Sequence, residues 1–377
     1  MKPEPISGST LGGTIIGPEN RPLELENRST LVPPDTDCGT LPSLKWSFAD
    51  SRMRLGDGGW ARQTTIRELP ISTDLSGVNM RLNAGAIREM HWHKEAEWSY
   101  MLKGNARITV VDQDGRTFQE DLEEGDLWYF PPGIPHSIQG IGKDGCEFLL
   151  VFDSGDFSED STFLLTDWLA HTPKEVLAKN FNVPESAFAH IPKEELYIFM
   201  GKIPPPLEKN RVAGNGPVPL KLSHKMLAQQ PIKTKYGQVR ITDSSNFPAS
   251  ANIAAALVEV EPGGMRELHW HPNGAEWQFY LTGKGRMTVF ASEGKARTLD
   301  YQAGDVGVVP FPMGHYIENT GKTTLRFLEI FKSSYFADVS LPQWLAFTPF
   351  DLVQSHLHID QSVLAKVTKN KIPIVPA

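Results

Sequence analysis

The chain has 377 residues, of which 40% are hydrophobic and 22% are charged, and its formal net charge is −8. This composition is that of an ordinary globular protein and not of a disordered or fibrous one. An acidic balance without clusters of lysine and arginine argues against nucleic acid as a partner. The sequence has no run of 18 apolar residues, so we expect no membrane-spanning helix.

The first 13 residues lack the apolar stretch of a signal peptide. We therefore expect a cytoplasmic protein, or a secreted one if a leader has been removed. The two cysteines, Cys38 and Cys146, are too few for a disulfide framework. They favour two inert thiols, and the sequence leaves a single bridge open.

Residues 1–43 are rich in proline, glycine, serine and asparagine, which predicts an extended N-terminal arm of the kind that often packs on a neighbouring subunit. From residue 44, short apolar segments such as ARITVVD and EFLLVF alternate with turn signals such as DQDG and EEGD. This pattern indicates an all-β barrel or sandwich. A proline- and glycine-rich stretch at 203–219 predicts a linker between an N-terminal domain, 44–202, and a C-terminal domain, 220–377.

Each set of strands is followed by a segment with helical character. Residues 166–181 are expected to form a helix. Within it, Thr172 and Pro173 fit the start of a capping box, and Thr348 and Pro349 repeat this pattern near the C-terminus. A few flanking helices are therefore expected beside the strands.

The second half of the sequence is a copy of the first. RLNAGAIREMHWHKEAEWSYMLKGNARITVV aligns with VEVEPGGMRELHWHPNGAEWQFYLTGKGRMTVF. The match continues with LEEGDLWYFPPGIPHSI and YQAGDVGVVPFPMGHYI. His269 follows His91 by 178 residues, and His315 follows His136 by 179. A repeat of this length is a duplicated domain and not a solenoid, whose period is roughly 20–50 residues.

Both copies contain a pair of histidines, separated by one tryptophan, on a predicted strand. Side chains alternate between the two faces of a strand, so the two histidines of each pair share one face. A glutamate follows each pair, and a later histidine lies in a glycine- and proline-rich turn. These two sets of four side chains have the spacing of metal ligands: His91, His93, Glu97 and His136; His269, His271, Glu276 and His315. A single copy of this pattern would as readily be a pair of core histidines, but the recurrence of all four residue types in both copies favours metal binding.

The spacing of these residues, with the surrounding glycines, resembles the two motifs of the cupin superfamily. The resemblance implies two cupin barrels in tandem, of the double-stranded β-helix or jelly-roll type, and a metal in each. Three imidazoles and one carboxylate suit an octahedral divalent ion such as manganese or iron. The tryptophans beside the motifs favour plain packing: Trp92, Trp98, Trp128, Trp270 and Trp277.

Arg88 and Arg266 each precede a ligand histidine by three residues. Strict strand alternation directs Arg88 away from the metal unless a bulge intervenes. The cupin resemblance favours the opposite, with both arginines binding a carboxylate substrate through their planar forks. An ion pair with a neighbouring acid is the alternative role.

The copies differ at two informative places. The first has three extra residues between Phe152 and Pro173, within Ser158–Ser161, and a longer polar loop beside one site suggests a lid that carries the acid Glu159. Composition alone favours a solvated loop. In the second copy, Glu329 replaces the apolar Leu150. Since burying an acid without a partner is costly, Glu329 faces either solvent or the second metal cavity, where it would take part in the chemistry.

The segments REMHWHKEAEWSYML, EGDLWYFPPGIPHS and FSEDSTFLLTDWLAHTPKEV resemble the oxalate decarboxylases, a family of two-domain cupins. The resemblance runs from about residue 30 to the end. It implies conversion of oxalate to formate and carbon dioxide with two Mn²⁺ per chain and dioxygen as co-catalyst. The N-terminal site would be catalytic, with oxalate held by Arg88 and Glu159 supplying a proton. Asp160 departs from the family's Ser-Glu-Asn-Ser lid, which puts the balance between decarboxylation and oxidation in question.

Two alternatives remain. An oxalate oxidase would use the same ligands and yield carbon dioxide and hydrogen peroxide. A storage or binding cupin would have no activity, but such proteins commonly lose ligands and this chain keeps all eight. We expect a small-molecule substrate and a homo-oligomer, a trimer or hexamer.

Overall fold

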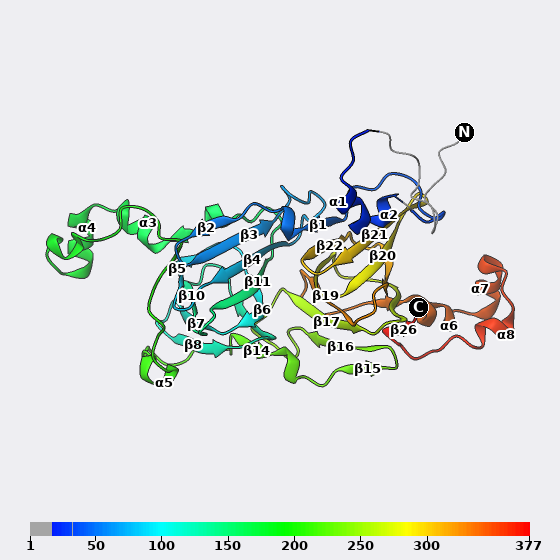
Figure 1. Ribbon diagram of the computed structural model, residues 1–377. Coiled ribbons are helices and arrows are strands. Elements are labelled where there is room, and N and C mark those ends of the chain that lie inside the picture. Colours follow the sequence, from blue (N-terminus) through cyan, green and yellow to red (C-terminus); the bar gives the residue numbers. More distant parts are fainter. Residues whose placement is uncertain (1–16, 32) are drawn as a thin grey trace. The chain divides into compact units, whose positions relative to one another are not determined.

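The computed structural model describes residues 17–31 and 33–377, so predictions for residues 1–16 and 32 lie outside the described part. The chain divides into two compact units (Figure 1). The first barrel is built from residues 51–229 and 244–252, and the second barrel from residues up to 50, 230–243 and 253–377. Each contains a seven-stranded and a six-stranded antiparallel sheet, which confirms the predicted all-β class.

The larger sheet of the first barrel has β14 and β2 at its edges. Its strands, in spatial order, are β14 (Ser223–Lys225), β9 (Asp126–Phe130), β6 (Glu97–Gly104), β11 (Cys146–Phe152), β4 (Ser76–Leu82), β3 (Gly59–Thr64) and β2 (Arg54–Gly56). The smaller sheet runs β12 (Phe163–Leu164), β5 (Ile87–Trp92), β10 (His136–Gly140), β7 (Ala106–Val111) and β8 (Thr117–Leu122), and β13 (Ile198–Phe199) also pairs with β5.

The second barrel repeats this arrangement. Its larger sheet runs β1 (Lys45–Ser47), β22 (Asp305–Val309), β19 (Glu276–Thr282), β24 (Leu325–Phe331), β17 (Ala254–Val260), β16 (Gly237–Thr242) and β15 (Ile232–Thr234). Its smaller sheet runs β21 (Lys295–Gln302), β20 (Lys284–Ala291), β23 (Gly314–Asn319), β18 (Gly264–Trp270) and β25 (Val339–Ser340), and β26 (Ile374–Pro376) also pairs with β18.

Two edge strands lie outside the division drawn from the sequence. β1 pairs with β22 of the second barrel, although it precedes the first barrel in the chain. β14 pairs with β9 of the first barrel, although it follows the proline-rich stretch. An open sheet edge accepts whichever strand the chain brings beside it, and local composition does not encode this choice.

The described part of the N-terminal arm packs on the second barrel of its own chain. It contains the short helices α1 (Arg21–Glu26) and α2 (Arg28–Leu31), which composition did not predict. The backbone amide of Ser29 donates to Asp300 at 3.1 Å, and that of Thr298 donates to Asp37 at 2.8 Å. Cys38 and Cys146 are both free, which confirms two thiols.

The helices outside the arm are short. They are α3 (Leu165–Ala170), α4 (Lys174–Phe181), α5 (Leu207–Asn210), α6 (Leu341–Ala346), α7 (Phe350–Leu357) and α8 (Gln361–Leu364), with 3₁₀ turns η1 (Phe48–Asp50), η2 (Glu159–Ser161), η3 (Glu185–Phe188) and η4 (Met226–Ala228). Among the described residues, no helix has the length and apolar character needed to cross a membrane.

The predicted capping boxes are wrong. The segment 166–181 is two helices, and the second one begins at Lys174 with Pro173 at the cap position and no side-chain cap. Pro173 breaks the predicted helix because it has no amide hydrogen to donate. The hydroxyl of Thr172 instead donates to the carbonyl of Trp168 at 2.8 Å, and Thr348 does the same toward Trp344.

A β-bulge decides the direction of Arg88. Between β5 and β10, His91 pairs with His136, but Arg88 pairs with Ile138, so three residues of β5 span only two residues of β10. The extra residue interrupts the alternation. Arg88 and His91 are therefore both buried, while Met90 is exposed. The same irregularity lies between Arg266 and His269 on β18.

Candidate metal centres

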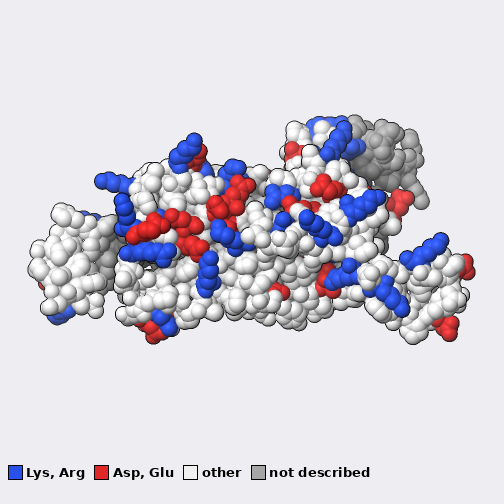
Figure 2. All heavy atoms as spheres, turned by 90° about the horizontal axis from the view of Figure 1, so that it is seen from below, with Lys and Arg blue, Asp and Glu red and all other residues white. Residues whose placement is uncertain are grey.

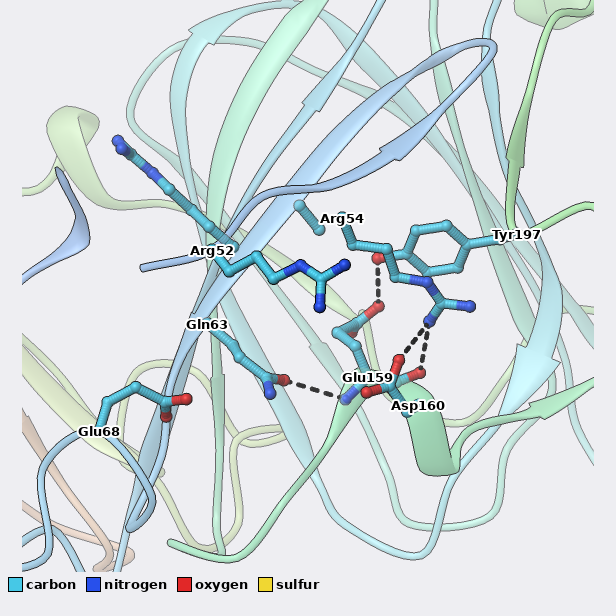
Figure 3. A pocket seen from close by; sticks show the side chains of 9 residues that line it. Arg52, Arg54, Gln63, Glu68, Glu159, Asp160 and Tyr197 are labelled. Carbon is cyan, nitrogen blue, oxygen red and sulfur yellow. Dashed lines mark hydrogen bonds and ion pairs between the residues drawn. The ribbon is translucent and has the colours of Figure 1, made fainter. Parts of the chain in front are cut away.

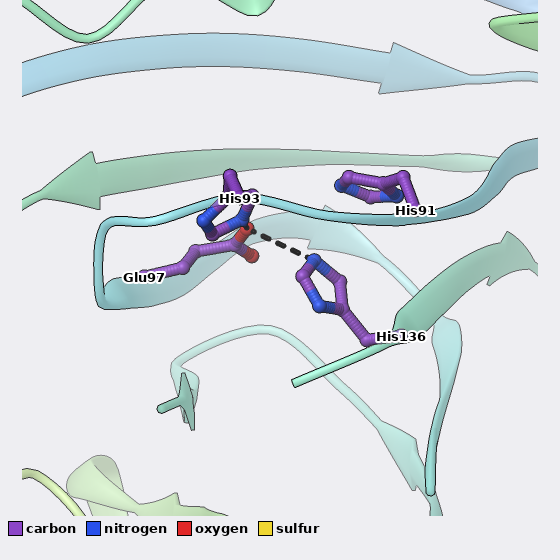
Figure 4. Close-up of side chains that lie close together, drawn as sticks. All are labelled: His91, His93, Glu97 and His136. Carbon is purple, nitrogen blue, oxygen red and sulfur yellow. Dashed lines mark hydrogen bonds and ion pairs between the residues drawn. The ribbon is translucent and has the colours of Figure 1, made fainter. Parts of the chain in front are cut away.

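Each barrel brings its four predicted ligands together. In the first barrel, β5 supplies His91 and leads into His93, β6 begins with Glu97, and β10 begins with His136 (Figure 4). One nitrogen or oxygen atom from each of the four side chains lies within 4.8 Å of the others, and all four residues are buried. The second barrel groups its four in the same way: His269, His271, Glu276 and His315.

The histidine rings are oriented by main-chain carbonyls. In the first barrel, Nδ1 of His91 faces the carbonyl of Glu89 at 2.6 Å, and Nδ1 of His136 faces that of Ile134 at 2.8 Å. Nδ1 of His93 faces the carbonyl of Glu95 at 2.8 Å. A carbonyl only accepts, so each Nδ1 carries the proton and each Nε2 presents a lone pair.

The atoms that meet in the centre cannot satisfy one another. In the second cluster, Oε2 of Glu276 lies 3.1 Å from Nε2 of His271 and 2.8 Å from Nε2 of His315. These three atoms and Nε2 of His269 are buried without a hydrogen-bond donor among the described residues. Since buried polar atoms normally have partners, lone pairs converging in this way fit a cation held between them.

The pKa shifts agree with a neutral-histidine, ionised-glutamate cluster. Burial and the positive charge of Arg88 lower the pKa of His91 well below its usual value. Burial also lowers the pKa of His136. Burial alone would raise the pKa of Glu97, but interactions with His136 and His93 lower it below the usual range. Neutral imidazoles and a carboxylate are the protonation states that bind a metal.

The two clusters hold their carboxylates differently. In the first, Oε1 of Glu97 accepts hydrogen bonds from the Ser99 hydroxyl and from Nε1 of Trp128, both at 3.2 Å, which leaves Oε2 directed at the histidines. In the second, Oε1 of Glu276 accepts from the amide of Gln278 at 2.7 Å. The interpretation of Trp128 as plain packing is therefore incomplete, because its indole also orients a ligand.

Arg88 reaches the first cluster with unused donors. Its side chain is 1% exposed, and its Nη2 lies 3.1 Å from Oε2 of Glu159 and 3.2 Å from the hydroxyl of Thr162. Nε and Nη1 of Arg88 are buried without a hydrogen-bond partner among the described residues. A buried guanidinium with two free donors is suited to bind an anion.

Arg266, the counterpart of Arg88, has its donors occupied. Nε donates to Glu329 at 3.1 Å, Nη2 to Asp338 at 2.6 Å and Nη1 to the carbonyl of Pro373 at 3.4 Å. The assignment of Arg266 to substrate binding stays a prediction. The strand register is the same in both barrels, and the residue type at one equivalent position differs: Leu150 pairs with Ser99, whereas Glu329 pairs with Gln278 and accepts from Arg266.

Glu329 faces the interior of the second barrel. It is fully buried, its Oε2 has no partner among the described residues, and burial raises its pKa. The nearby negative charge of Glu276 raises the pKa further, against the lowering effect of Arg266. Glu329 therefore does not point to solvent, which was one of the two directions left open by the sequence. A catalytic role for Glu329 stays a prediction.

The segment Ser158–Ser161 directs Glu159 inward. The Ser158 hydroxyl caps the 3₁₀ turn η2 by accepting from the amide of Asp160. Glu159 is 6% exposed, so the segment is not simply a solvated loop. Oε2 of Glu159 accepts a hydrogen bond from the hydroxyl of Tyr197 at 3.0 Å (Figure 3). The same oxygen accepts a hydrogen bond from Nη2 of Arg88 at 3.1 Å. An acid, an arginine and a phenol thus meet beside the first cluster.

Sequence reasoning did not find Tyr197 or Arg54, which complete this group. Both line, with Glu159 and Asp160, a pocket of about 390 Å³ in the first barrel. Tyr197 is held by Glu89, whose carboxylate accepts from the Tyr197 amide at 2.8 Å. Comparison of the two copies would not have singled them out, because many other positions also differ and only contacts between distant segments bring these two residues to Glu159.

Comparison with known proteins agrees with the geometry. The cupin family matches residues 50–187 and 224–364. Oxalate decarboxylase OxdC of Bacillus subtilis (strain 168) is 57% identical over 374 residues, covering 99% of this chain and 97% of that protein. A probable oxalate decarboxylase of Arthroderma benhamiae is 43% identical and covers 99% of this chain and 93% of that protein.

Solved structures agree as well. A structure of the Bacillus subtilis oxalate decarboxylase, studied for the fine-structure parameters of its Mn(II) centres, superposes with a TM-score of 0.96 at 56% identity and covers 100% of this chain and 99% of that one. The match extends over both barrels and confirms two tandem cupin domains. The chain therefore belongs to the cupin family and, within it, to the oxalate decarboxylases.

Proposed function

We propose that this chain is a manganese-dependent oxalate decarboxylase whose first cluster carries the reaction. Hydrogen oxalate would be converted to formate and carbon dioxide, with dioxygen required but not consumed. The observation that carries the proposal is the pair of free donors on buried Arg88, beside a cluster of three imidazoles and one carboxylate. The kinship with OxdC of Bacillus subtilis supports oxalate as the substrate.

The four ligands in each barrel fit manganese. Nitrogen and carboxylate oxygen donors without cysteine suit a divalent ion that keeps open coordination positions. When bound with dioxygen in the first cluster, manganese supplies the one-electron redox chemistry that weakens the carbon–carbon bond of oxalate. We propose two Mn²⁺ per chain, since the second cluster has the same donor set.

Arg88 would bind and orient the substrate. Its Nε and Nη1 can donate to one carboxylate of oxalate. In the second barrel Glu329 accepts from the equivalent arginine, but the first barrel has the apolar Leu150 at that position, so no acid competes with the substrate. The contact with Arg88 would fix the distal carboxylate while the other faces the ligand cluster. Fixing both ends of a small anion lowers the entropic cost of reaching the transition state.

Glu159, whose carboxylate is ion-paired with Arg88, would take the acidic proton of hydrogen oxalate and deliver it to the carbon from which carbon dioxide departs. Its carboxyl group is held in the site by Arg88 and Tyr197. When the carbon–carbon bond breaks, the remaining one-carbon fragment needs one proton at carbon to become formate. Burial of Glu159 keeps water from the same position, so the segment 158–161 would act as a lid.

The charge distribution is consistent with a small-molecule substrate. On the face shown in Figure 2, lysine and arginine side chains lie among aspartate and glutamate side chains and form no single basic patch. This mixture does not favour nucleic acid, for which clustered basic side chains are typical.

The chain would assemble as a trimer or hexamer. Large apolar side chains are exposed around the outer face of β5 in the first barrel: Met90, Phe163 and Trp168. Their exposed fractions are 55%, 55% and 61%, and an exposed group of large apolar side chains is typical of a surface that binds another protein. Light scattering of the purified protein tests this proposal, and a monomer would contradict it.

The activity is tested by incubating the protein with Mn²⁺ and oxalate, with and without air, and measuring formate and peroxide separately. We expect formate as the main product in air and little turnover without dioxygen. Peroxide as the main product would instead identify an oxalate oxidase, and no turnover would contradict both assignments.

A further inference from the structure

Arg54 contacts two residues of the segment 158–161, Glu159 and Asp160. Its Nη1 lies 3.1 Å from Oδ1 of Asp160 and donates to the main-chain carbonyl of Glu159 at 3.2 Å (Figure 3). Its Nη2 forms an ion pair with Glu195. One guanidinium thus joins the edge strand β2 to two of the three residues of η2 and to Glu195, which follows η3.

The same guanidinium stacks on Tyr197. The central carbon of Arg54 lies 3.6 Å from the centre of the tyrosine ring, and that of Arg88 lies 4.6 Å from it. Tyr197 is therefore in contact with two cations, while its hydroxyl donates to Glu159. Since both cation–π contacts hold the ring in place, Arg54 fixes the hydroxyl that holds the inward carboxyl group.

The second barrel lacks this whole group. Arg54 lies five residues before Gly59, and the residue five before Gly237 is Ile232. Ile198 pairs with Arg88 and Ile374 pairs with Arg266, so Pro373 stands where Tyr197 stands. The three extra residues of the segment 158–161 are also absent from the second copy. The arginine, the tyrosine and the longer segment therefore occur together, in one barrel only.

We propose that Arg54 is a positioning residue that latches the segment 158–161 over the first cluster and thereby sets the ratio of decarboxylation to oxidation. This inference rests on the proposed function. Arg54 does not touch the ligand cluster; it acts through Asp160, the Glu159 carbonyl and Tyr197. Asp160, which departs from the family pattern, gives the latch a charged partner.

The position of Glu159, set by the latch, would decide between decarboxylation and oxidation of oxalate. With Glu159 inside, hydrogen oxalate yields formate and carbon dioxide, and the proton reaches carbon. With Glu159 outside, no proton arrives at carbon; oxalate then loses two electrons and yields two carbon dioxide molecules, while dioxygen gains these electrons and two protons and yields hydrogen peroxide. Loosening the latch therefore shifts product from formate to peroxide without a change in the metal ligands.

The first test is the product ratio of Arg54→Met and Arg54→Lys, both loaded with Mn²⁺ and assayed in air. Arg54 is partly exposed and its contacts are individually modest, so we expect Arg54→Met to lower the rate of formate formation about five- to tenfold and to raise the peroxide share about threefold or more. Arg54→Lys keeps the charge and should recover part of the loss. Arg52→Met, in the same pocket, is the control and should leave the ratio unchanged.

The second test follows the segment itself and needs no activity. A glutamate-specific protease is added to the folded protein, and cleavage between Glu159 and Asp160 is followed by mass spectrometry. We expect protection in the wild type and in Arg52→Met, and faster cleavage in Arg54→Met. An unchanged product ratio together with unchanged cleavage in the Arg54 variants would overturn the latch. If the wild type makes no formate, the proposed function fails, and the cleavage rates alone decide the latch.

Discussion

Arg88 and Glu159 form an ion pair that is almost completely removed from water: Nη2 and Oε2 are 3.1 Å apart, and the side chains are 1% and 7% exposed. The arginine comes from a strand of the barrel and the glutamate from the segment that is longer in the first copy. This pair joins the anion-binding group to the proton donor. The pair uses only Nη2 of Arg88, so Nε and Nη1 remain free to donate to a substrate.

Glu159→Gln should remove the proton donor and keep the shape of the site. The amide can still accept a hydrogen bond from Arg88, but it has no proton to give at carbon. We expect formate formation to fall by about a hundredfold or more, which corresponds to roughly 2.7 kcal/mol, while peroxide increases. Glu159→Ala should likewise lose most formate formation. In both variants the manganese content should equal that of the wild type, and full formate production would refute the role of Glu159.

Arg88→Lys should weaken substrate binding and orientation. A lysine keeps one positive charge but cannot donate from two parallel nitrogens to a carboxylate. We expect kcat/KM for oxalate to fall about a hundredfold, with the metal content unchanged. Steady-state kinetics of the manganese-loaded variant check this, and a kcat/KM within about threefold of the wild type would contradict the assignment.

His91→Ala should remove the metal from the first cluster and leave the second loaded. The cluster would lose one of its three imidazole ligands, which weakens its hold on the ion. We expect about one manganese per chain and no formate. His171→Ala is the control, because His171 is exposed and lies in neither cluster. Two manganese ions per chain in His91→Ala would show that His91 is not a ligand.

The metal-free protein should lose stability as the pH falls from 7.5 to 5. Burial lowers the pKa values of His91, His136 and His269 in the folded state. The unfolded chain therefore binds more protons below about pH 6.5, and protonation favours unfolding. We expect the Tm of the metal-free protein to fall by about 5 °C or more over this range. A Tm that stays constant or rises would show that these histidines are not held neutral.

Much of the site could be predicted because it depends on local rules. His91 and His93 share a face through strand alternation, and the repetition of the set in the second half separated ligands from ordinary core histidines. The cost of burying an acid marked Glu329 as unusual but left its direction open between solvent and the second metal cavity, and the structure shows it buried. The all-β class followed from short strands and frequent turns.

The features that could not be predicted depend on contacts between distant segments. The bulge that turns Arg88 inward is a property of the pairing between β5 and β10, not of β5 alone. Arg54 and the Glu159 carbonyl are 105 residues apart in the chain. The capping prediction failed because Pro173 is itself the N-cap residue of α4, while the Thr172 hydroxyl donates back to the carbonyl of Trp168 in α3.

The most direct measurement of the central claim is the manganese content of the purified chain after loading with Mn²⁺ and removal of unbound ion. Each barrel presents three buried imidazole nitrogens and one carboxylate oxygen within 4.8 Å of one another. We expect two manganese ions per chain by elemental analysis. A protein that retains no manganese would contradict the account, because neither cluster would then hold the ion on which the proposed reaction depends.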